Sequence, residues 1–365
     1  MPSTELLDDT VGLLKALVAI PSVSGNEDQV ATFLDRQLGS WFPGHVKRSG
    51  HNLIVDLKGE AEGPTLLLCS HIDTVAPAKD WTRAPFAATV EGDKIYGLGA
   101  NDAGASVVSM IGAARAVYPL KAGRLVLCFA AEEEAGSQGF MKVEAELPRY
   151  DAAIFGEPTN MGVASAIRGS MRAIMRSHGK SCHASRPWEG KNACDAFAED
   201  LRKLRCIDLK DNSPWKQATV EPTVIHGGQS TNQIPDLVEA TLDIRTTPEK
   251  NNSWIEEIFK KAGLDIEITI NRRRPMASDP ASPLIRAIRR ADPELADYIF
   301  NGSCDMAFTT APSIVLGPGR SERSHAADEF ITIQELSRAV QIYTSVLASY
   351  LCQQPITPSC IPVSH

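Results

Sequence analysis

The sequence predicts an α/β protein whose main domain is interrupted by a smaller α+β sandwich. Short apolar runs alternate with helical patterns in the first third of the chain, which is typical of a sheet covered by helices. Between residues 167 and 274 the pattern changes to strands with alternating apolar and polar residues and two amphipathic helices. The first pattern returns after Pro275. At roughly 100–200 residues per domain, the 365 residues suffice for about two domains, which we place at 1–166 with 275–365 and at 167–274.

The expected elements begin and end at local signals. The helix over 6–20 stops at Pro21-Ser22-Val23-Ser24-Gly25, and Asp102 is placed to cap the helix over 103–117. The other helices expected in the main domain are 28–38, 137–147, 282–291 and 333–352, and its expected strands are 52–58, 65–70, 124–130, 152–155 and 313–316. The inserted domain is expected to hold strands 171–178, 219–226 and 238–246 and helices 192–204 and 250–262. The tail from Gln353 is rich in proline and serine and is expected to be loose.

Composition and charge exclude several classes of protein. The net charge is -8, and we expect no nucleic-acid partner because such proteins usually carry a basic face. No apolar run approaches the ~20 residues that span a bilayer. The segment Met1–Asp9 lacks the basic start and the apolar stretch of a secretory signal. We therefore expect a cytoplasmic protein with no membrane partner.

Cysteine usage agrees with that compartment. None of the cysteines forms a C-x-x-C pair and several lie in apolar runs, so we expect reduced, mostly buried thiols. The eight residues are Cys69, Cys128, Cys182, Cys194, Cys206, Cys304, Cys352 and Cys360.

Polar residues that could carry chemistry follow the predicted strands, at the positions where open α/β sheets bind ligands. Histidine nitrogens and carboxylate oxygens in one cluster suit zinc. Three carboxylates, two divalent ions and a bridging hydroxide would together be neutral. The residues concerned are His71 and Asp73, Asp102, Glu132-Glu133-Glu134, Glu157, and His325.

Each of these residues also has a structural interpretation when taken alone. His71 alone is more often a hydrogen-bonded loop residue, and the three consecutive glutamates are more often a solvated turn. Asp102 alone is a helix cap. The Gly97-x-Gly99 pair fails as a dinucleotide loop because Asp102 stands where the third glycine belongs. No G-x-S-x-G elbow exists, which argues against a serine hydrolase.

Five motifs in order resemble one known family. These are His71-x-Asp73, Gly97-x-Gly99-x-x-Asp102, Glu133-Glu134-x-Gly136, Gly156-Glu157-Pro158 and His325. They resemble the dinuclear zinc amidohydrolases, which include acetylornithine deacetylase, succinyl-diaminopimelate desuccinylase, carboxypeptidase G and aminoacylase. The resemblance runs from about Ala16 to Leu347. It implies a zinc-peptidase-like α/β/α catalytic domain with an inserted lid and dimerisation domain.

The resemblance implies a role for each motif residue. His71 and Glu157 would be the terminal ligands of one Zn²⁺ and Glu134 and His325 those of the other, with Asp102 bridging; Co²⁺ could substitute. Asp73 would accept the ring N–H of His71 and fix its tautomer. Glu133 would be the general base. The choice among the three glutamates depends on aligning them with the family's acidic-Glu-Glu-x-Gly pattern.

The inserted segment carries further resemblances. Gly179-Lys180-Ser181-Cys182-His183-Ala184-Ser185 resembles the family's histidine loop, so His183 is expected to polarise the scissile carbonyl, in cis or from a partner subunit of a homodimer. Asn232 and Arg245 resemble the contacts to the substrate carboxylate, for which a guanidinium is well suited. Gly317 is a further candidate for substrate binding.

The substrate class follows from the same resemblance. The stretches 99–106 and 316–330 most resemble short acetylornithine deacetylases, which implies a small N-acyl amino acid and release of ornithine in arginine biosynthesis. Desuccinylation of a diaminopimelate precursor is the first alternative. Deacylation of N-acetylcitrulline or N-succinylornithine, and a zinc carboxypeptidase, aminopeptidase or dipeptidase, also stay open. A non-catalytic scaffold that dimerises through the insert is the alternative from a different class.

Overall fold

The computed structural model describes residues 3–352, so the tail from Gln353, including Cys360, lies outside the described residues. The chain forms two compact units. The first contains residues up to 165 together with 278–298 and the chain from 309. The second contains 166–277 and 299–308. Within residues 3–352, no helix is long and apolar enough to cross a membrane.

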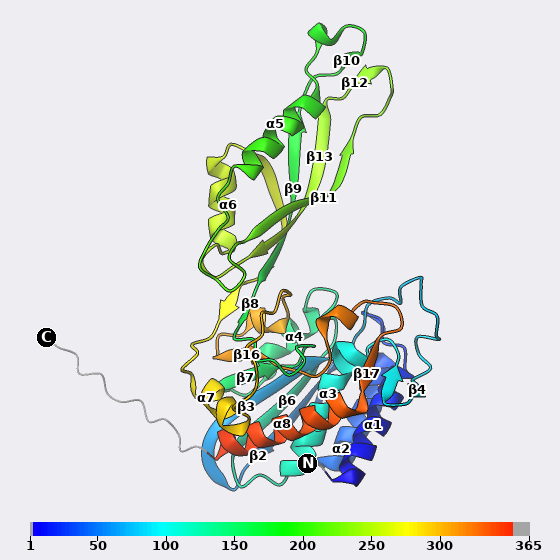
Figure 1. Ribbon diagram of the computed structural model, residues 1–365, viewed down its shortest axis with the longest axis vertical. Helices are drawn as coiled ribbons and strands as arrows, with labels where there is room; N and C mark the ends of the chain where they lie inside the picture. Colours follow the sequence, from blue (N-terminus) through cyan, green and yellow to red (C-terminus); the bar gives the residue numbers. More distant parts are fainter. Residues whose placement is uncertain (1–2, 353–365) are drawn as a thin grey trace, which may run out of the picture. The chain divides into compact units, whose positions relative to one another are not determined.

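The first unit is built on a six-stranded sheet in the order β1-β2-β6-β3-β7-β16 (Figure 1). The four strands from β6 to β16 are parallel, and β1 and β2 extend the sheet as an antiparallel edge. A small sheet β17-β5-β4 lies in the same unit. The strands are β1 (Val46–Ser49), β2 (Asn52–Lys58), β3 (Ala61–His71), β4 (Thr89–Glu91), β5 (Lys94–Tyr96), β6 (Ala122–Ala130), β7 (Ala152–Phe155), β16 (Ser313–Val315) and β17 (Phe330–Thr332).

Alternate residues of the central strands face a core formed with five helices. Leu66 and Leu68 of β3 share this core with Leu14, Ile111 and Tyr343. The intervening residue Leu67 is also fully buried, since both faces of a parallel sheet are covered. The helices of this core are α1 (Thr4–Val18), α2 (Asp28–Trp41), α3 (Ala105–Val117), α7 (Pro283–Ala291) and α8 (Ile333–Leu351). The short helix α4 (Gln138–Val143) packs Phe140 edge-on against Phe155 of β7.

The second unit is a four-stranded antiparallel sheet in the order β11-β13-β9-β14 with two helices. Burial alternates along its central strands. Met171, Ala173 and Met175 of β9 are buried with residues of both helices, such as Leu204 and Phe259. The elements are β8 (Ala166–Ile167), β9 (Gly169–His178), β10 (Cys182–His183), α5 (Ala193–Arg205), β11 (Thr219–Gly227), β12 (Gln233–Ile234), β13 (Leu237–Thr246), α6 (Asn252–Lys261), β14 (Asp265–Arg273) and β15 (Met276–Ala277).

Two expectations from the sequence are wrong. Asp102 does not cap α3, because the helix begins at Ala105 after Gly104, no side chain caps it, and Asp102 has non-helical angles of φ -122° and ψ 96°. The thiols are not mostly buried either. Cys69, Cys128 and Cys304 are buried, Cys182 is half-buried, and Cys194, Cys206 and Cys352 are exposed.

Candidate metal centre

Parallel strands bring the candidate residues of the first unit to one edge of the sheet. His71 is the last residue of β3, and the strands on either side of it are β6 and β7. Glu133 and Glu134 follow β6, Glu157 follows β7, and His325 lies in the segment after β16. The carboxyl ends of parallel strands meet at the same edge, so residues far apart in sequence converge there. Asp102 reaches the cluster from the turn Ala100–Gly104, just before α3.

Asp102 lies between the two imidazoles. Its Oδ1 is 3.3 Å from His71 Nε2, and its Oδ2 is 3.7 Å from His325 Nε2. At the outer ends, His71 Nε2 is 3.9 Å from Glu157 Oε2 and His325 Nε2 is 2.7 Å from Glu134 Oε1. The five side chains therefore form a row in which each imidazole has one terminal carboxylate and shares Asp102 with the other.

This donor set fits metal ions. One ligand atom each from His71, Asp102 and Glu134 lie within 4.8 Å of one another, which is the spacing of groups that can share an ion. Imidazole nitrogens and carboxylate oxygens are ligands for zinc and for other divalent transition metals. Two terminal carboxylates and two imidazoles around the shared carboxylate of Asp102 give enough donors for two ions.

The carboxylates of the cluster give it excess negative charge, which raises the pKa values of its members. Burial raises the pKa of Glu157 well above its ordinary value, and the charges of Asp102 and Glu133 add to this effect. The hydrogen bond to Glu134 raises the pKa of His325 to about 9. Burial opposes a charge on His71, but hydrogen bonds to Asp102 and Asp73 raise its pKa well above its ordinary value. All three shifts favour the protonated form, and a bound cation would offset the same negative charge.

Asp73 contacts the ring of His71 and also holds the turn of the two glutamates, which the sequence does not predict. The Nδ1 atom of His71 is 3.0 Å from the main-chain carbonyl of Asp73 and 3.5 Å from its carboxylate, so the carbonyl is the closer acceptor. The carboxylate accepts the N–H groups of Glu133 at 3.0 Å and Glu134 at 3.1 Å, and the hydroxyl of Ser24 at 2.7 Å. Asp73 thus fixes the turn that carries the two glutamates.

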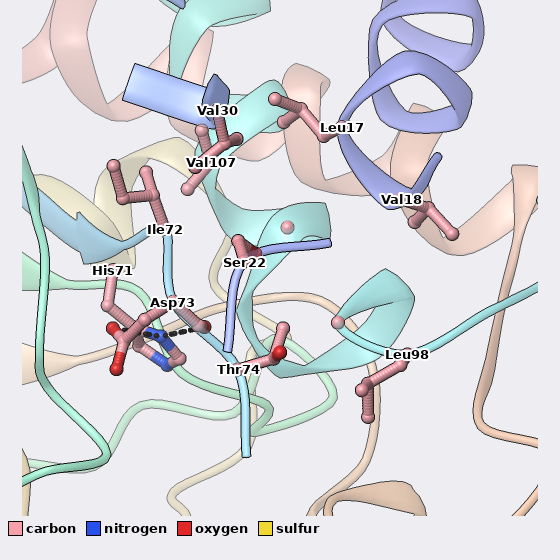
Figure 2. Close-up of a pocket in the computed structure, with 12 residues that line it drawn as sticks. Leu17, Val18, Ser22, Val30, His71, Ile72, Asp73, Thr74, Leu98 and Val107 are labelled. Carbon is pink, nitrogen blue, oxygen red and sulfur yellow. Dashed lines mark hydrogen bonds and ion pairs between the residues drawn. The ribbon is translucent and has the colours of Figure 1, made fainter. Parts of the chain in front are cut away.

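A small pocket of ≈ 20 Å³ adjoins His71 and Asp73 (Figure 2). Its walls are mainly apolar, with Leu17 and Val18 from α1 and Val107 from α3. Figure 2 shows Ile72 pointing toward the apolar side chains, while His71 and Asp73 lie together on the other side of the chain. The alternation at the strand end therefore points Ile72 into apolar surroundings and places His71 and Asp73 on the opposite side.

Sequence reasoning missed two buried carboxylates near the centre. Glu329 accepts the main-chain N–H groups of Asn101 and Asp102, and burial together with the charge of Asp102 raises its pKa to about 8. Glu27, which is 0% exposed, accepts the N–H groups of Gly25 and Glu132. Neither has a sequence signal that distinguishes it from a surface acid, because both bind main-chain groups that only the folded loops bring together.

Gly317 is buried in the first unit, and its main chain is already engaged. Its N–H bonds the hydroxyl of Thr159, and its carbonyl accepts the N–H groups of Thr159 and Met161. A Cβ at this position would lie 2.5 Å from the carbonyl oxygen of Glu157. The absence of a side chain therefore allows the strand of Glu157 to approach closely.

The remaining candidates lie in the second unit, which brings two of them together. His183 pairs with Gln233 in the short ladder of β10 and β12, and the N–H of Ala184 donates to the carbonyl of Asn232. His183 is exposed. Arg245 lies near the far end of β13, where its guanidinium bonds Asp243 at 2.8 Å and 3.2 Å.

The sequence pattern of the peptidase family M20/M25/M40 matches residues 67–349, which include all five residues of the metal cluster. The chain belongs to this family. It is a metal-dependent hydrolase of amide bonds, as the resemblance implies.

Individual relatives are distant but cover the whole chain. A probable succinyl-diaminopimelate desuccinylase of Staphylococcus epidermidis is 26% identical, over 94% of this chain and 98% of that protein. An M20 metallo-carboxypeptidase from Sulfolobus solfataricus is 20% identical with a TM-score of 0.75, over 95% of this chain and 99% of that one. A dinuclear metal-binding M20 peptidase of Bacillus subtilis is 19% identical with a TM-score of 0.73, over 96% and 99%. At these identities the structures establish the fold.

Proposed function

We propose that the protein removes the acyl group of an N-acyl amino acid with two zinc ions held by His71, Asp102, Glu134, Glu157 and His325. The observation that carries this proposal is the place of Asp102, whose two oxygens face the two imidazoles. Among these side chains, only a carboxylate can readily bridge two ions. In this arrangement His71 and Glu157 complete one site, and Glu134 and His325 complete the other.

Glu133 is the general base in the proposed reaction. When bound, the metal ions would polarise the amide carbonyl and acidify a water molecule. Glu133 is 6% exposed, and its charge acts on the carboxyl of Glu157, which supports a position beside the ligands. It takes a proton from water as the oxygen bonds to the amide carbon, and delivers that proton to nitrogen as the C–N bond breaks. The products are a carboxylic acid and an amine.

His183 is the proposed donor to the carbonyl oxygen. Its Nδ1 lies 3.2 Å from the main-chain N of Ser185, and that N–H can only donate. Nδ1 therefore acts as an acceptor, and the neutral ring carries its proton on Nε2. An exposed Nε2–H is a suitable group to stabilise negative charge on a carbonyl oxygen.

The dimensions of the second unit support donation of His183 from a partner subunit. Arg245 lies eight positions beyond Leu237 in β13 (245 minus 237), which is roughly 26 Å at about 3.3 Å per residue. His183 pairs with Gln233, which precedes the start of that strand (Figure 1). A small substrate cannot bridge this span. If His183 and Arg245 both contact one substrate, they come from two copies of the chain, in a homodimer formed through the inserted domain.

N-acetyl-L-ornithine is the substrate we propose, with ornithine and acetate as products. The stretches 99–106 and 316–330 carry this choice through their resemblance to short acetylornithine deacetylases. Arg245 would bind the substrate carboxylate together with the partner subunit's Asn232, because Asn232 lies beside His183. N-succinyl-diaminopimelate is the second candidate, because a probable desuccinylase aligns with 94% of the chain.

A hydrolysis panel tests the proposal. Chelated protein is reloaded with Zn²⁺ or Co²⁺ and assayed with N-acetyl-L-ornithine, N-acetyl-L-citrulline, N-succinyl-L-ornithine, N-succinyl-LL-diaminopimelate and a dipeptide. We expect the highest kcat/KM on N-acetyl-L-ornithine and none with the Glu133→Gln variant. A preference for the succinyl compounds would replace the first candidate by the second, and activity on the dipeptide alone would overturn both.

A further inference from the structure

Three main-chain N–H groups of the loop over residues 97–104 converge on one buried carboxylate, that of Glu329. The Oε1 atom of Glu329 lies 2.7 Å from the N of Asn101 and 2.9 Å from the N of Asp102, and its Oε2 lies 3.2 Å from the N of Gly99. Neighbouring N–H groups arranged in this way form a concavity that binds anions. In this protein the concavity is filled by a side chain of the same molecule, from a residue that is 2% exposed.

The side chain of Asn101 forms a second connection between the loop over residues 97–104 and the segment over residues 320–329. Its Oδ1 accepts the N–H of Arg320 at 2.8 Å, and its Nδ2 donates to the carbonyl of Arg320 at 3.1 Å and to the hydroxyl of Ser324 at 3.3 Å. The carbonyl of Glu329 accepts the N–H of Gly97 at 2.9 Å. The segment 320–329, which carries His325, is therefore attached at both ends to the loop that carries Asp102.

The loop is closely packed at two of its glycines. Gly99 has a φ of +77°, and a Cβ on it would lie 2.7 Å from Thr74 Cγ2. A Cβ on Gly104 would lie 2.5 Å from the carbonyl oxygen of Gly99. The N–H groups of Ala100 and Gly104 bond to carbonyls within the loop. Those of Gly99, Asn101 and Asp102 need another acceptor, because burial without a partner would be costly. Glu329 is the group that satisfies them.

We propose that Glu329 is a positioning residue for the metal centre, which fixes the main chain of Asp102 against the segment of His325 and so sets where the shared carboxylate lies. The N atom of Asp102 is bonded to the same Cα that carries its side chain. A fixed N–H therefore restricts the carboxylate to the rotations about χ1 and χ2. This inference rests on the proposed metal-dependent function.

The chemistry of the carboxylate explains why glutamine would not replace it. Two oxygens with several lone pairs can accept all three N–H groups, with Oε1 serving two and Oε2 one. In Glu329→Gln one oxygen becomes an NH₂ group, which would face a main-chain N–H donor. At least one of the three hydrogen bonds is lost. Glu329→Asp keeps the charge but shortens the side chain by one methylene.

Titration of chelated protein with Co²⁺, followed by visible absorption, tests the proposal directly. The parent should bind two ions per chain. We expect Glu329→Gln to bind the ions about 10- to 100-fold more weakly, as for other groups that orient ligands, with a changed absorption spectrum. Glu329→Asp should fall between them. With saturating metal, kcat on the best panel substrate should fall while KM stays near that of the parent.

Glu335→Gln is the matched control. Glu335 anchors the same segment through Arg323 and accepts from Thr332, but it makes no contact with the loop of Asp102 among the described hydrogen bonds. It should keep the parental Co²⁺ affinity and spectrum. Far-UV circular dichroism and Tm of the chelated variants show whether each is folded; should Glu329→Gln be unfolded, Glu329→Asp decides.

Two outcomes contradict different parts of the account. If the parent binds two Co²⁺ ions and the folded Glu329 variants bind them with unchanged affinity and spectrum, the positioning role is wrong while the proposed function stands. If the parent binds no metal and hydrolyses no substrate of the panel, both are wrong.

Discussion

Glu133 and Glu134 are neighbours in the chain, yet the proposed chemistry gives them different roles. The structure places Glu134 Oε1 2.7 Å from His325 Nε2, and it buries Glu133 beside Glu157. Glu133→Gln should keep both metal ions and lose at least about 10²-fold in kcat, because an amide cannot accept the proton. Glu134→Gln should instead weaken metal binding. Metal content by mass spectrometry and kcat measured on the same samples separate the two effects.

Glu132→Gln is the control for this pair. Its carboxylate pairs with Lys142 at 3.2 Å on the surface of the turn, and pairs of this kind contribute little. Its activity should match the parent. Activity lost in Glu132→Gln and retained in Glu133→Gln would mean that the base lies one residue earlier.

Gly317→Ala tests whether Gly317 serves close packing of the main chain or binding of the substrate. The added Cβ would lie 2.5 Å from the carbonyl oxygen of Glu157, so the strand ends must separate, at a cost of about 1–3 kcal/mol of stability. We expect a lower Tm and weaker metal binding with little change in KM. Gly12→Ala, where a Cβ meets nothing within 4 Å, should not lower Tm. A large rise in KM at unchanged Tm would instead support substrate binding by Gly317.

Helix α8 depends on its first turn. Thr332 accepts the N–H of Glu335, and Glu335 accepts the N–H of Thr332, so each satisfies a donor that the helix leaves free. Thr332→Ala should lower the free energy of unfolding by about 1 kcal/mol and leave kcat unchanged, as measured by urea denaturation and by the substrate assay. Thr332→Ser keeps the hydroxyl and should retain the parental stability. Equal stability of Thr332→Ala and parent would show that this cap contributes nothing.

The helices and strands with clear patterns of apolar residues were predictable from the sequence. Short or less regular elements were not. The predicted strand 52–58 agrees with β2 to the residue, and helix 333–352 agrees with α8 within one residue. Strand β14 was missed even though its apolar and polar residues alternate. The two-residue ladder of β10 and β12 is too short for any periodicity to reveal it.

The metal cluster was predictable as a set of residues, but its support was not. Conspicuous motifs at strand ends marked His71, Glu134 and His325. The helix cap expected at Asp102 failed because the loop before α3 is tighter than a regular helix start, and Glu329 satisfies its N–H groups. Such contacts join residues more than 200 positions apart, and no local pattern reports them.

The two units of the chain have separate cores, and the proposed chemistry needs residues of both. The span between His183 and Arg245 within the second unit predicts that each site of a dimer contains a histidine from the partner. His183→Ala alone should lose about 10²- to 10³-fold in kcat, typical of one lost oxyanion donor, with metal content unchanged. Full activity would remove His183 from the mechanism.

Subunit mixing tests the partner arrangement. Inactive His183→Ala mixed with inactive Glu133→Gln should regain activity, because one of the two sites in a mixed dimer then holds both an intact base and an intact histidine. The assay compares the mixture with each variant alone after subunit exchange is verified by native mass spectrometry. No recovery despite exchange would place His183 in the same chain as the base.

The metal requirement is the central claim, and metal reconstitution tests it most directly. Protein treated with a chelator and then freed of it is titrated with Zn²⁺ while metal content and hydrolysis of N-acetyl-L-ornithine and N-succinyl-LL-diaminopimelate are measured together. We expect no activity in the metal-free protein and full activity at two ions per chain. Undiminished hydrolysis by protein shown to contain no metal would contradict the account.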